Sequence, residues 1–192
     1  MTPIIFYDTE TNGIPDWHNP SDAEHQPHIV QIAALMVDAE SSEVLQTLDL
    51  VVRPDGWDIP QETVDIHGIT KEYAMDVGVS EKVALDAFMQ LWNERLRIGH
   101  SQNFDARIVR IALKRYFGDR EADRWKEGRR DCTGYLSRPA FGMKGNRIPK
   151  LSQAYQHFLG KPLDGAHSAL ADAYACMELY FAIRDASAEE AA

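Results

Sequence analysis

Two carboxylates, Asp8 and Glu10, lie one residue apart at the end of the apolar run from Pro3 to Tyr7. Residues i and i+2 of an extended strand project from the same face, and so apolar a strand is typical of a sheet centre buried on both sides. Two ionised carboxylates repel each other there, and burying them without a counter-charge is costly. Because oxygen ligands favour Mg²⁺ or Mn²⁺, we expect a divalent cation at this point.

A third carboxylate, Asp172, is predicted on a helix near the end of the sequence. Apolar residues between 168 and 184 recur at helical spacing, and Asp172 falls on their stripe, so it is expected to face the core. His167 stands at the entrance of this helix, where an imidazole can act as a base near neutral pH. A fourth acid, Asp105, lies at the N-terminal end of another predicted helix.

Each of these residues has a simpler structural explanation when it is taken alone. An Asp after a strand is commonly a turn former, an Asp at a helix start interacts favourably with the helix dipole, and a single His is usually a hydrogen-bonded polar residue. The combination of four acids and one His, with two of the acids on predicted buried faces, is poorly explained in this way. It indicates a joint chemical role.

The elements that must position these residues are strands followed by alternating helices and strands. Strands are predicted at residues 3–8, 28–37, 43–53, 97–99 and 129–133, and helices at 80–97, 104–116, 151–158 and 168–184. A turn at 39–42 joins the second and third strands as a hairpin, and a long polar loop spans residues 11–27. We therefore predict an α/β fold in which helices flank both faces of a mixed five-stranded sheet, within a single domain over residues 1–185. Residues 186–192 are expected to be a frayed tail.

Composition narrows the class of protein further. The 192 residues carry a net charge of -10, which argues against an enzyme that wraps long duplexes with a basic surface. A small or terminal substrate is compatible with this charge, and two bound divalent cations would offset four of the negative charges. The sequence has two cysteines, no cleavable leader and no apolar run of membrane-spanning length, so we expect a cytoplasmic protein without membrane contact.

Four segments together resemble a known family. They are Phe6–Gly13, which contains Asp8-Thr9-Glu10; Ile66-His67-Gly68-Ile69-Thr70; Gly99–Asp105; and His167–Asp172. In order and spacing they resemble the 3′-5′ exonucleases with the Asp-Glu-Asp-Asp-His (DEDDh) signature, which include the proofreading subunit of bacterial replicative polymerases. The resemblance covers nearly the whole chain and implies the ribonuclease H-like exonuclease fold.

The resemblance also implies roles for the five acid and histidine positions. Two divalent cations, Mg²⁺ or Mn²⁺, are expected, with Asp8 bridging both, Glu10 and Asp172 completing the water-activating site, and Asp105 supporting the second ion. His167 is expected to accept the proton of the attacking water. The implied reaction is two-metal hydrolysis of phosphodiester bonds at the 3′ end of single-stranded DNA or RNA, with release of 5′-mononucleotides.

Contacts to the substrate are assigned by the same resemblance. Thr11, the backbone near Asn12, His100, Asn103 and Phe104 are expected at the terminal nucleotide. Many relatives have Asn directly after the His of the third segment, where this chain has Ser101, and Asn occurs here at 103.

Three exposed-loop features leave alternatives open. Ile14 is either a wedge beside the last base or ordinary core. Trp17 and His18 either stack on a base, as aromatic side chains do in single-strand binding, or pack under their own loop. The segment 138–150 carries four basic residues and no acid, and is either a flap that contacts phosphates or a solvated loop.

Two other functions are compatible with the residues. One is an oligoribonuclease-like enzyme restricted to very short RNA, and the other is a non-catalytic nucleic-acid-binding or polymerase-associated module. No residue can be tied to a 2′-hydroxyl, so the sequence leaves DNA or RNA preference open. It also leaves open the oligomeric state and association with a polymerase in trans.

Overall fold

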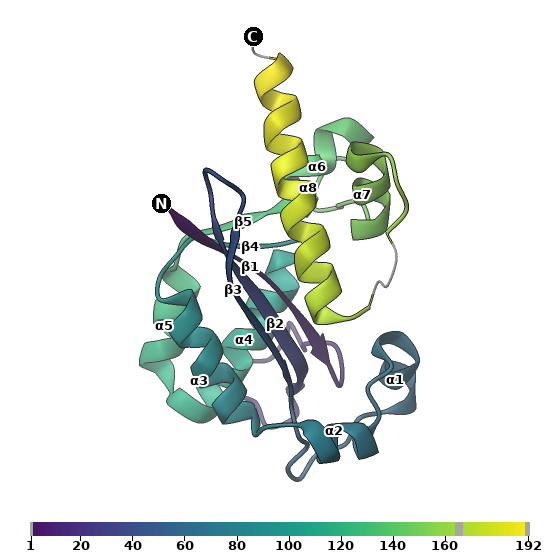
Figure 1. The fold of residues 1–192 in the computed structure, drawn as a ribbon. Coiled ribbons are helices and arrows are strands. Elements are labelled where there is room, and N and C mark those ends of the chain that lie inside the picture. The colour runs from purple at the N-terminus through teal and green to yellow at the C-terminus, as the bar shows by residue number, and fades with distance from the viewer. Residues whose placement is uncertain (1, 164–166, 191–192) are drawn as a thin grey trace.

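The computed structural model of the protein describes residues 2–163 and 167–190. A mixed five-stranded sheet in the order β3-β2-β1-β4-β5 forms the centre (Figure 1). Its strands are β1 (Pro3–Thr11), β2 (Ile29–Asp38), β3 (Val44–Val51), β4 (Arg97–Gly99) and β5 (Arg130–Cys132). The helices are α1 (Gln61–His67), α2 (Lys71–Val77), α3 (Glu81–Trp92), α4 (Gln102–Phe117), α5 (Asp119–Glu127), α6 (Thr133–Ser137), the 3₁₀ helix η1 (Arg138–Phe141), α7 (Leu151–Leu159) and α8 (Ala169–Glu190). The predicted fold class, with its five strands, is confirmed.

Strand β1 occupies the middle of the sheet, as its apolar sequence predicts. It pairs antiparallel with β2, which forms a hairpin with β3, and parallel with β4, which in turn pairs parallel with β5. Strands β1 to β3 thus form an antiparallel meander, and β4 and β5 are parallel strands that the chain reaches through helical crossovers. This topology brings the end of β1 beside the segment that follows β4.

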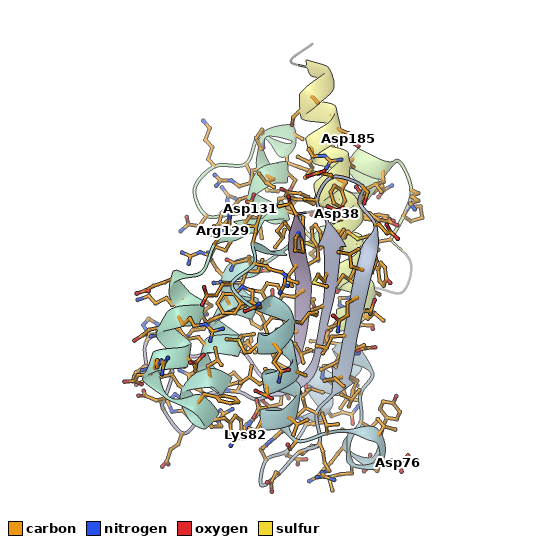
Figure 2. All side chains as sticks on the ribbon, turned by 60° about the vertical axis from the view of Figure 1, so that its left-hand side comes forward. Asp38, Asp76, Lys82, Arg129, Asp131 and Asp185 are labelled. Carbon is orange, nitrogen blue, oxygen red and sulfur yellow. The ribbon has the colours of Figure 1, made fainter. Side chains whose placement is uncertain are left out.

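Helices cover both faces of the sheet, and the alternation of side chains along β1 assigns one set to each. Tyr7 packs against Phe88 of α3 and Trp125 of α5 on one face. Phe6 packs against Tyr180 and Phe181 of α8 on the other. Figures 1 and 2 show these two layers and the side chains that fill the space between sheet and helices.

The end of the chain differs from the sequence-based expectation. Helix α8 continues to Glu190, whereas the pattern predicts an end near Arg184 and a frayed tail over residues 186–192. The extension follows from Ala and Glu residues that favour helix and from the absence of Gly or Pro in this stretch. The Ser187 hydroxyl donates to the Ile183 carbonyl at 2.8 Å within the extension. Residues 191–192 of the predicted tail lie outside the described part.

Helices α1, α2, α5 and α6 are absent from the predicted elements: α1, α2 and α6 are short, and α5 has only Ala122 and Trp125 as buried residues. α1 and α2 follow one another closely, and Gly68 ends α1 with a φ of 74°, a backbone conformation that glycine adopts without strain. None of the helices in the described ranges combines the length and hydrophobicity needed to cross a bilayer.

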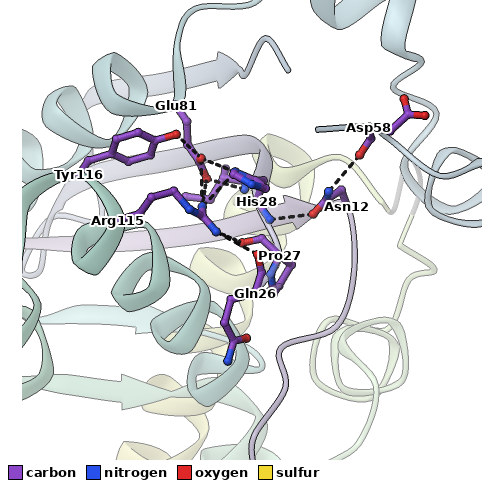
Figure 3. A network of polar contacts seen from close by, with 9 residues as sticks. Asn12, Gln26, Pro27, His28, Asp58, Glu81, Arg115 and Tyr116 are labelled. Atoms are coloured by element: carbon purple, nitrogen blue, oxygen red, sulfur yellow. Dashed lines mark hydrogen bonds and ion pairs between the residues drawn. The ribbon is translucent and has the colours of Figure 1, made fainter. Parts of the chain in front are cut away.

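A buried carboxylate ties the loop before β2 to two helices (Figure 3). Glu81, at the start of α3, is 3% exposed and contacts His28 Nδ1 at 2.7 Å, the backbone N–H of Ile29 at 2.9 Å and the Tyr116 hydroxyl at 2.9 Å. Arg115 of α4 donates to the same carboxylate at 3.2 Å. Burial alone raises the pKa of Glu81, but these partners outweigh it and hold the pKa below its usual value.

We predict that Glu81→Ala lowers the free energy of unfolding by about 3 to 5 kcal/mol, because it leaves Arg115 and His28 without their buried partner. Urea unfolding at pH 7 measures this change. The control is Asp76→Ala, which removes an exposed acid on α2 that makes no hydrogen bond among the described residues, and is expected to stay within about 0.5 kcal/mol of wild type. Equal destabilisation by the two substitutions would show that the hydrogen bonds of Glu81 contribute nothing to the free energy of unfolding.

Candidate active site

Three carboxylates converge where β1 ends and α8 begins. Asp8 and Glu10 project from the face of β1 that α8 covers, and Asp172 lies in the first turn of α8. One carboxylate oxygen from each lies within 4.8 Å of the others. The structure therefore brings together three of the four acids that the sequence predicts at one centre.

A glutamine that the sequence analysis did not single out fixes the start of α8. The Gln31 side-chain oxygen accepts the backbone N–H of Ala169 at 3.1 Å, and its amide nitrogen donates to Asp49 Oδ1 at 2.7 Å. Gln31 is the register partner of Glu10 on the neighbouring strand β2. This contact satisfies an N–H group that a helix start otherwise leaves unpaired, and it holds Asp172 over the sheet.

The fourth acid, Asp105, approaches the centre from the opposite face of the sheet. It lies in the first turn of α4 and is 2% exposed. Its Oδ1 accepts the Thr9 hydroxyl at 2.7 Å and the Thr9 backbone N–H at 3.2 Å. Thr9 points away from Asp8 and Glu10 along β1, so these bonds place Asp105 behind the two carboxylates.

His167 lies directly before α8 with a φ of 75°. Non-glycine residues seldom adopt this left-handed conformation, and the strain is typical of functional sites. The His167 backbone N–H points at Asp172 Oδ2 at 3.4 Å, and the residue is exposed to solvent. Gly165 and Ala166, which precede His167 in the sequence, lie outside the described residues.

Burial and mutual repulsion raise the pKa values of the acids. Burial raises the pKa of Glu10 to about 7, and the charges of Asp172 and Asp105 act in the same direction. Burial also raises the pKa of Asp105 to about 7, although the Thr9 hydrogen bonds oppose it. The pKa of Asp8 lies well above its usual range because of burial and then the charges of Asp105, Asp172 and Glu10. Burial raises the pKa of Asp172 as well.

These residues fit divalent cations. Asp172 Oδ1 is buried and has no hydrogen-bond partner among the described residues, and it belongs to a set made entirely of carboxylate oxygens. Hard cations such as Mg²⁺ and Mn²⁺ prefer this donor set. A cation would compensate these buried negative charges, and Asp8, Glu10 and Asp172 are the residues that would hold it.

A pocket of about 450 Å³ opens beside Glu10, and we call it the α1 pocket. It is lined by the end of β1 and the loop after it, by α1 and by α4, with Thr11, Ile14, Ile66, His67 and Phe104 among its residues. Ile14 is 81% exposed, so its interpretation as ordinary core is wrong. Thr11 and Phe104, which are expected to contact the terminal nucleotide, both line this pocket.

His67 supplies a polar group to the α1 pocket. Its Nδ1 accepts the backbone N–H of Ile69 at 3.0 Å, so the proton of the neutral ring resides on Nε2. Burial lowers the pKa of His67 and keeps the ring neutral near pH 7. Nε2 has no hydrogen-bond partner among the described residues. The sequence signal for this residue was the motif from Ile66 to Thr70, which carried no assigned role.

Other predicted substrate contacts have structural roles. The His100 ring is 7% exposed and bonds Thr133 Oγ1 at 3.0 Å and the Pro149 carbonyl at 2.8 Å, and its contact with substrate stays a prediction. The Asn12 side chain bridges the backbones of His28 and Asp58, at 2.7 and 2.9 Å (Figure 3). Its contact with substrate stays a prediction.

The long loop after β1 turns out to be partly exposed. Trp17 is 56% exposed, which contradicts its interpretation as packed under its own loop. Asn103 is exposed, and its amide donates to the Tyr135 hydroxyl at 3.3 Å. Both residues remain accessible to a ligand.

Solved structures of two exonucleases share this fold. The zinc-bound complex of Escherichia coli exonuclease I with single-stranded DNA superposes with a TM-score of 0.77 at 22% sequence identity, over 96% of this chain and 41% of that one. Exonuclease I from Methylocaldum szegediense gives a TM-score of 0.75 at 21% identity, over the same shares of the two chains. This chain thus spans less than half the length of these enzymes. The likeness places it in the ribonuclease H-like exonuclease fold.

Family membership follows from the sequence itself. The RNase T model, described as an exonuclease, matches residues 5–180. No curated protein matches the sequence. The chain belongs to this exonuclease family, and the predicted membership among DEDD-type 3′-5′ exonucleases is confirmed.

We predict that the metal-free protein loses stability as the pH rises from about 4.5 to about 7. Unfolded Glu10 releases its proton near 4.5, whereas the folded protein keeps it to about 7, so the folded state binds more protons in this window. Glu10→Gln is expected to flatten this part of the profile, measured as the thermal unfolding midpoint in chelator. Glu72→Gln, which changes an exposed acid on α2, is the control, and identical profiles for the two variants would contradict the assignment.

Proposed function

We propose that this chain is a metal-dependent 3′-5′ exonuclease domain that hydrolyses phosphodiester bonds at the 3′ end of single-stranded nucleic acid and releases 5′-mononucleotides. The observation that carries the proposal is the cluster of Asp8, Glu10 and Asp172 oxygens within 4.8 Å at the mouth of the α1 pocket. The cluster lies beside the α1 pocket, where a terminal nucleotide can be held. Both features belong to a chain of the exonuclease family.

The cation centre is proposed to hold two Mg²⁺ or Mn²⁺ ions. Asp8, Glu10 and Asp172 are the direct ligands, and Asp105 supports the second ion from behind β1. Bound there, the cations supply the positive charge that the phosphate needs as negative charge develops in the transition state, and they lower the pKa of the attacking water.

His167 is proposed as the general base. Its position before α8 is tied to Asp172 by the backbone contact at 3.4 Å, and its exposure allows the ring to exchange protons with solvent. The ring takes a proton from water as the water oxygen bonds to phosphorus and the bond to the 3′ oxygen of the preceding nucleotide breaks. The departing 3′ oxygen takes a proton from solvent water, and the ring then returns the proton that it accepted to solvent.

The α1 pocket is proposed to hold the terminal nucleotide. Exposed Ile14 and half-buried Phe104 offer apolar surface to a base, and the Thr11 side chain lines the same pocket. These groups position the last phosphodiester over the carboxylates, which is how a terminal nucleotide is distinguished from an internal one.

Single-stranded DNA is the first substrate to test. Escherichia coli exonuclease I, which shares the fold, has been solved in complex with dA16 and dT13 oligonucleotides. A polymerase bound in trans is not required for the proposed reaction. A reducing, cytoplasmic setting is part of the proposal, since both cysteines are free and buried.

We predict that a 5′-labelled single strand is shortened stepwise in Mg²⁺, whereas a 3′-labelled strand releases labelled mononucleotide at once. Asp8→Ala is expected to abolish both reactions, because it removes the carboxylate placed between the other acids. Gel analysis of matched DNA and RNA strands, with chelator as a blank, measures the reaction and its sugar preference. Cleavage that starts at the 5′ end, or binding without hydrolysis, would overturn the proposal.

We predict that His167→Ala lowers kcat by about 10²- to 10⁴-fold, the contribution of a general base, while substrate affinity changes little. His157→Ala is the matched control, since it removes an exposed histidine on α7. The measurement is single-turnover hydrolysis across a range of pH. An unchanged rate for His167→Ala would remove this residue from the reaction.

A further inference from the structure

A strongly basic groove lies outside the carboxylate centre. Its volume is about 710 Å³, and it runs between α4, the end of α5 and the edge strand β5. Its cationic lining side chains are Arg97, Arg107, Arg110, Lys126 and Arg130, and no acid lines it among the described residues. This concentration of positive charge is unexpected in a chain with a net charge of -10. We call this feature the basic groove.

Two arginines meet at the floor of the basic groove. Arg97 of β4 and Arg130 of β5 are register partners on neighbouring strands. Like charges in such positions destabilise a sheet unless something compensates them. Arg97 is fully buried, and its three guanidinium nitrogens have no hydrogen-bond partner among the described residues. Because Arg97 is fully buried, an anion in the groove would feel its charge at a distance, without a direct hydrogen bond.

Aromatic side chains flank these charges. The Arg97 guanidinium lies 3.7 Å from the centre of the Trp125 ring, which holds it in place. On the opposite wall, Trp17 is exposed and lies 5.8 Å from the Arg107 guanidinium. Arg107 is itself fixed by a hydrogen bond to the Asn19 carbonyl at 2.6 Å. Because a carbonyl carries no net charge, this bond leaves the positive charge of Arg107 in place. An exposed ring beside cationic side chains is the combination that binds single strands without regard to sequence, and Trp17 with Arg107 provides it here.

Shared lining residues connect the basic groove to the α1 pocket through an intermediate hollow. Trp17, Asn103 and Tyr135 line the groove and also a second hollow of about 310 Å³. Phe104 lines this hollow and the α1 pocket beside Glu10. A strand can therefore pass from the carboxylates over the start of α4 into the groove.

We propose that the basic groove binds the phosphates of the single strand on the 5′ side of the bond being hydrolysed, with Trp17 stacking on one of its bases. This inference rests on the proposed function and adds to it a track for the part of the substrate that is not yet cleaved. Lys126 and Arg130, which are exposed, contact phosphates, and Arg97 contributes its buried charge from beneath them. The track makes long strands better substrates than short ones.

The test compares Lys126→Gln/Arg130→Gln with wild type in chelator, where no hydrolysis occurs. Both side chains are exposed and neither forms an ion pair among the described residues, so the fold is expected to persist. Fluorescence anisotropy of 5′-labelled dT13 over a salt series measures binding. Loss of two phosphate contacts is expected to reduce the slope of log K against log salt by about 1.4. A labelled thymidine trinucleotide is expected to bind wild type and variant alike.

Controls separate the ionic contacts from other effects. Lys82→Gln/Arg120→Gln removes the same net charge at two exposed positions that do not line the groove; Figure 2 shows Lys82 well away from Arg129, which precedes β5. Its salt slope for dT13 is expected to match that of wild type. Trp17→Ala is expected to weaken dT13 binding at every salt concentration without changing the slope, because stacking releases no counterions.

The outcomes distinguish the track from the proposed function. Equal salt slopes for the groove variant and its control, or an equal loss of affinity for dT13 and the trinucleotide, would overturn the track. Hydrolysis assays with Mg²⁺ complete the comparison: the groove variant is expected to raise KM for dT13 while kcat for the trinucleotide is unchanged. If the groove variant lowers the salt slope of dT13 binding by about 1.4 but wild type hydrolyses neither strand, the proposed function fails and the groove stands.

Discussion

The repulsion among carboxylates at the end of β1 is the constraint on which the rest of the structure depends. The fold places Asp8 and Glu10 on a central strand, and then brings Asp172 to within 4.8 Å of both. Two anchors hold this unfavourable arrangement: Gln31 secures the start of α8, and Thr9 secures Asp105 at the start of α4. The sheet and its packed helices stabilise a centre that is poorly stable by itself, and the proposed cations would compensate its charge.

The sequence predicted the parts of this centre that depend on local periodicity. A two-residue period put Asp8 and Glu10 on one face of a strand, and a 3.6-residue period put Asp172 on the core-facing side of α8. The five strands followed from apolar runs and turn residues for the same reason. These patterns involve only a few neighbouring residues, so they can be recognised in a single sequence.

Features that depend on distant pairing could not be predicted in this way. Arg97 and Arg130 lie on separate strands, and parallel pairing alone makes them neighbours at the floor of the basic groove. The hydrogen-bond partners of the buried His100 ring, Thr133 and Pro149, lie far along the chain, so its motif position gave no sign of them. The end of α8 was missed because Ala and Glu residues favour helix without forming an apolar stripe.

Counting the Mn²⁺ ions bound at equilibrium tests the central claim most directly. Electron paramagnetic resonance of free Mn²⁺ during a titration near pH 7.5 gives this number for wild type, for Asp8→Asn and for Asp76→Asn, an exposed control on α2. If the carboxylates form a cation centre, wild type and Asp76→Asn bind two ions per chain, and Asp8→Asn loses them. Equal binding by wild type and Asp8→Asn, or no binding by wild type, would contradict the account.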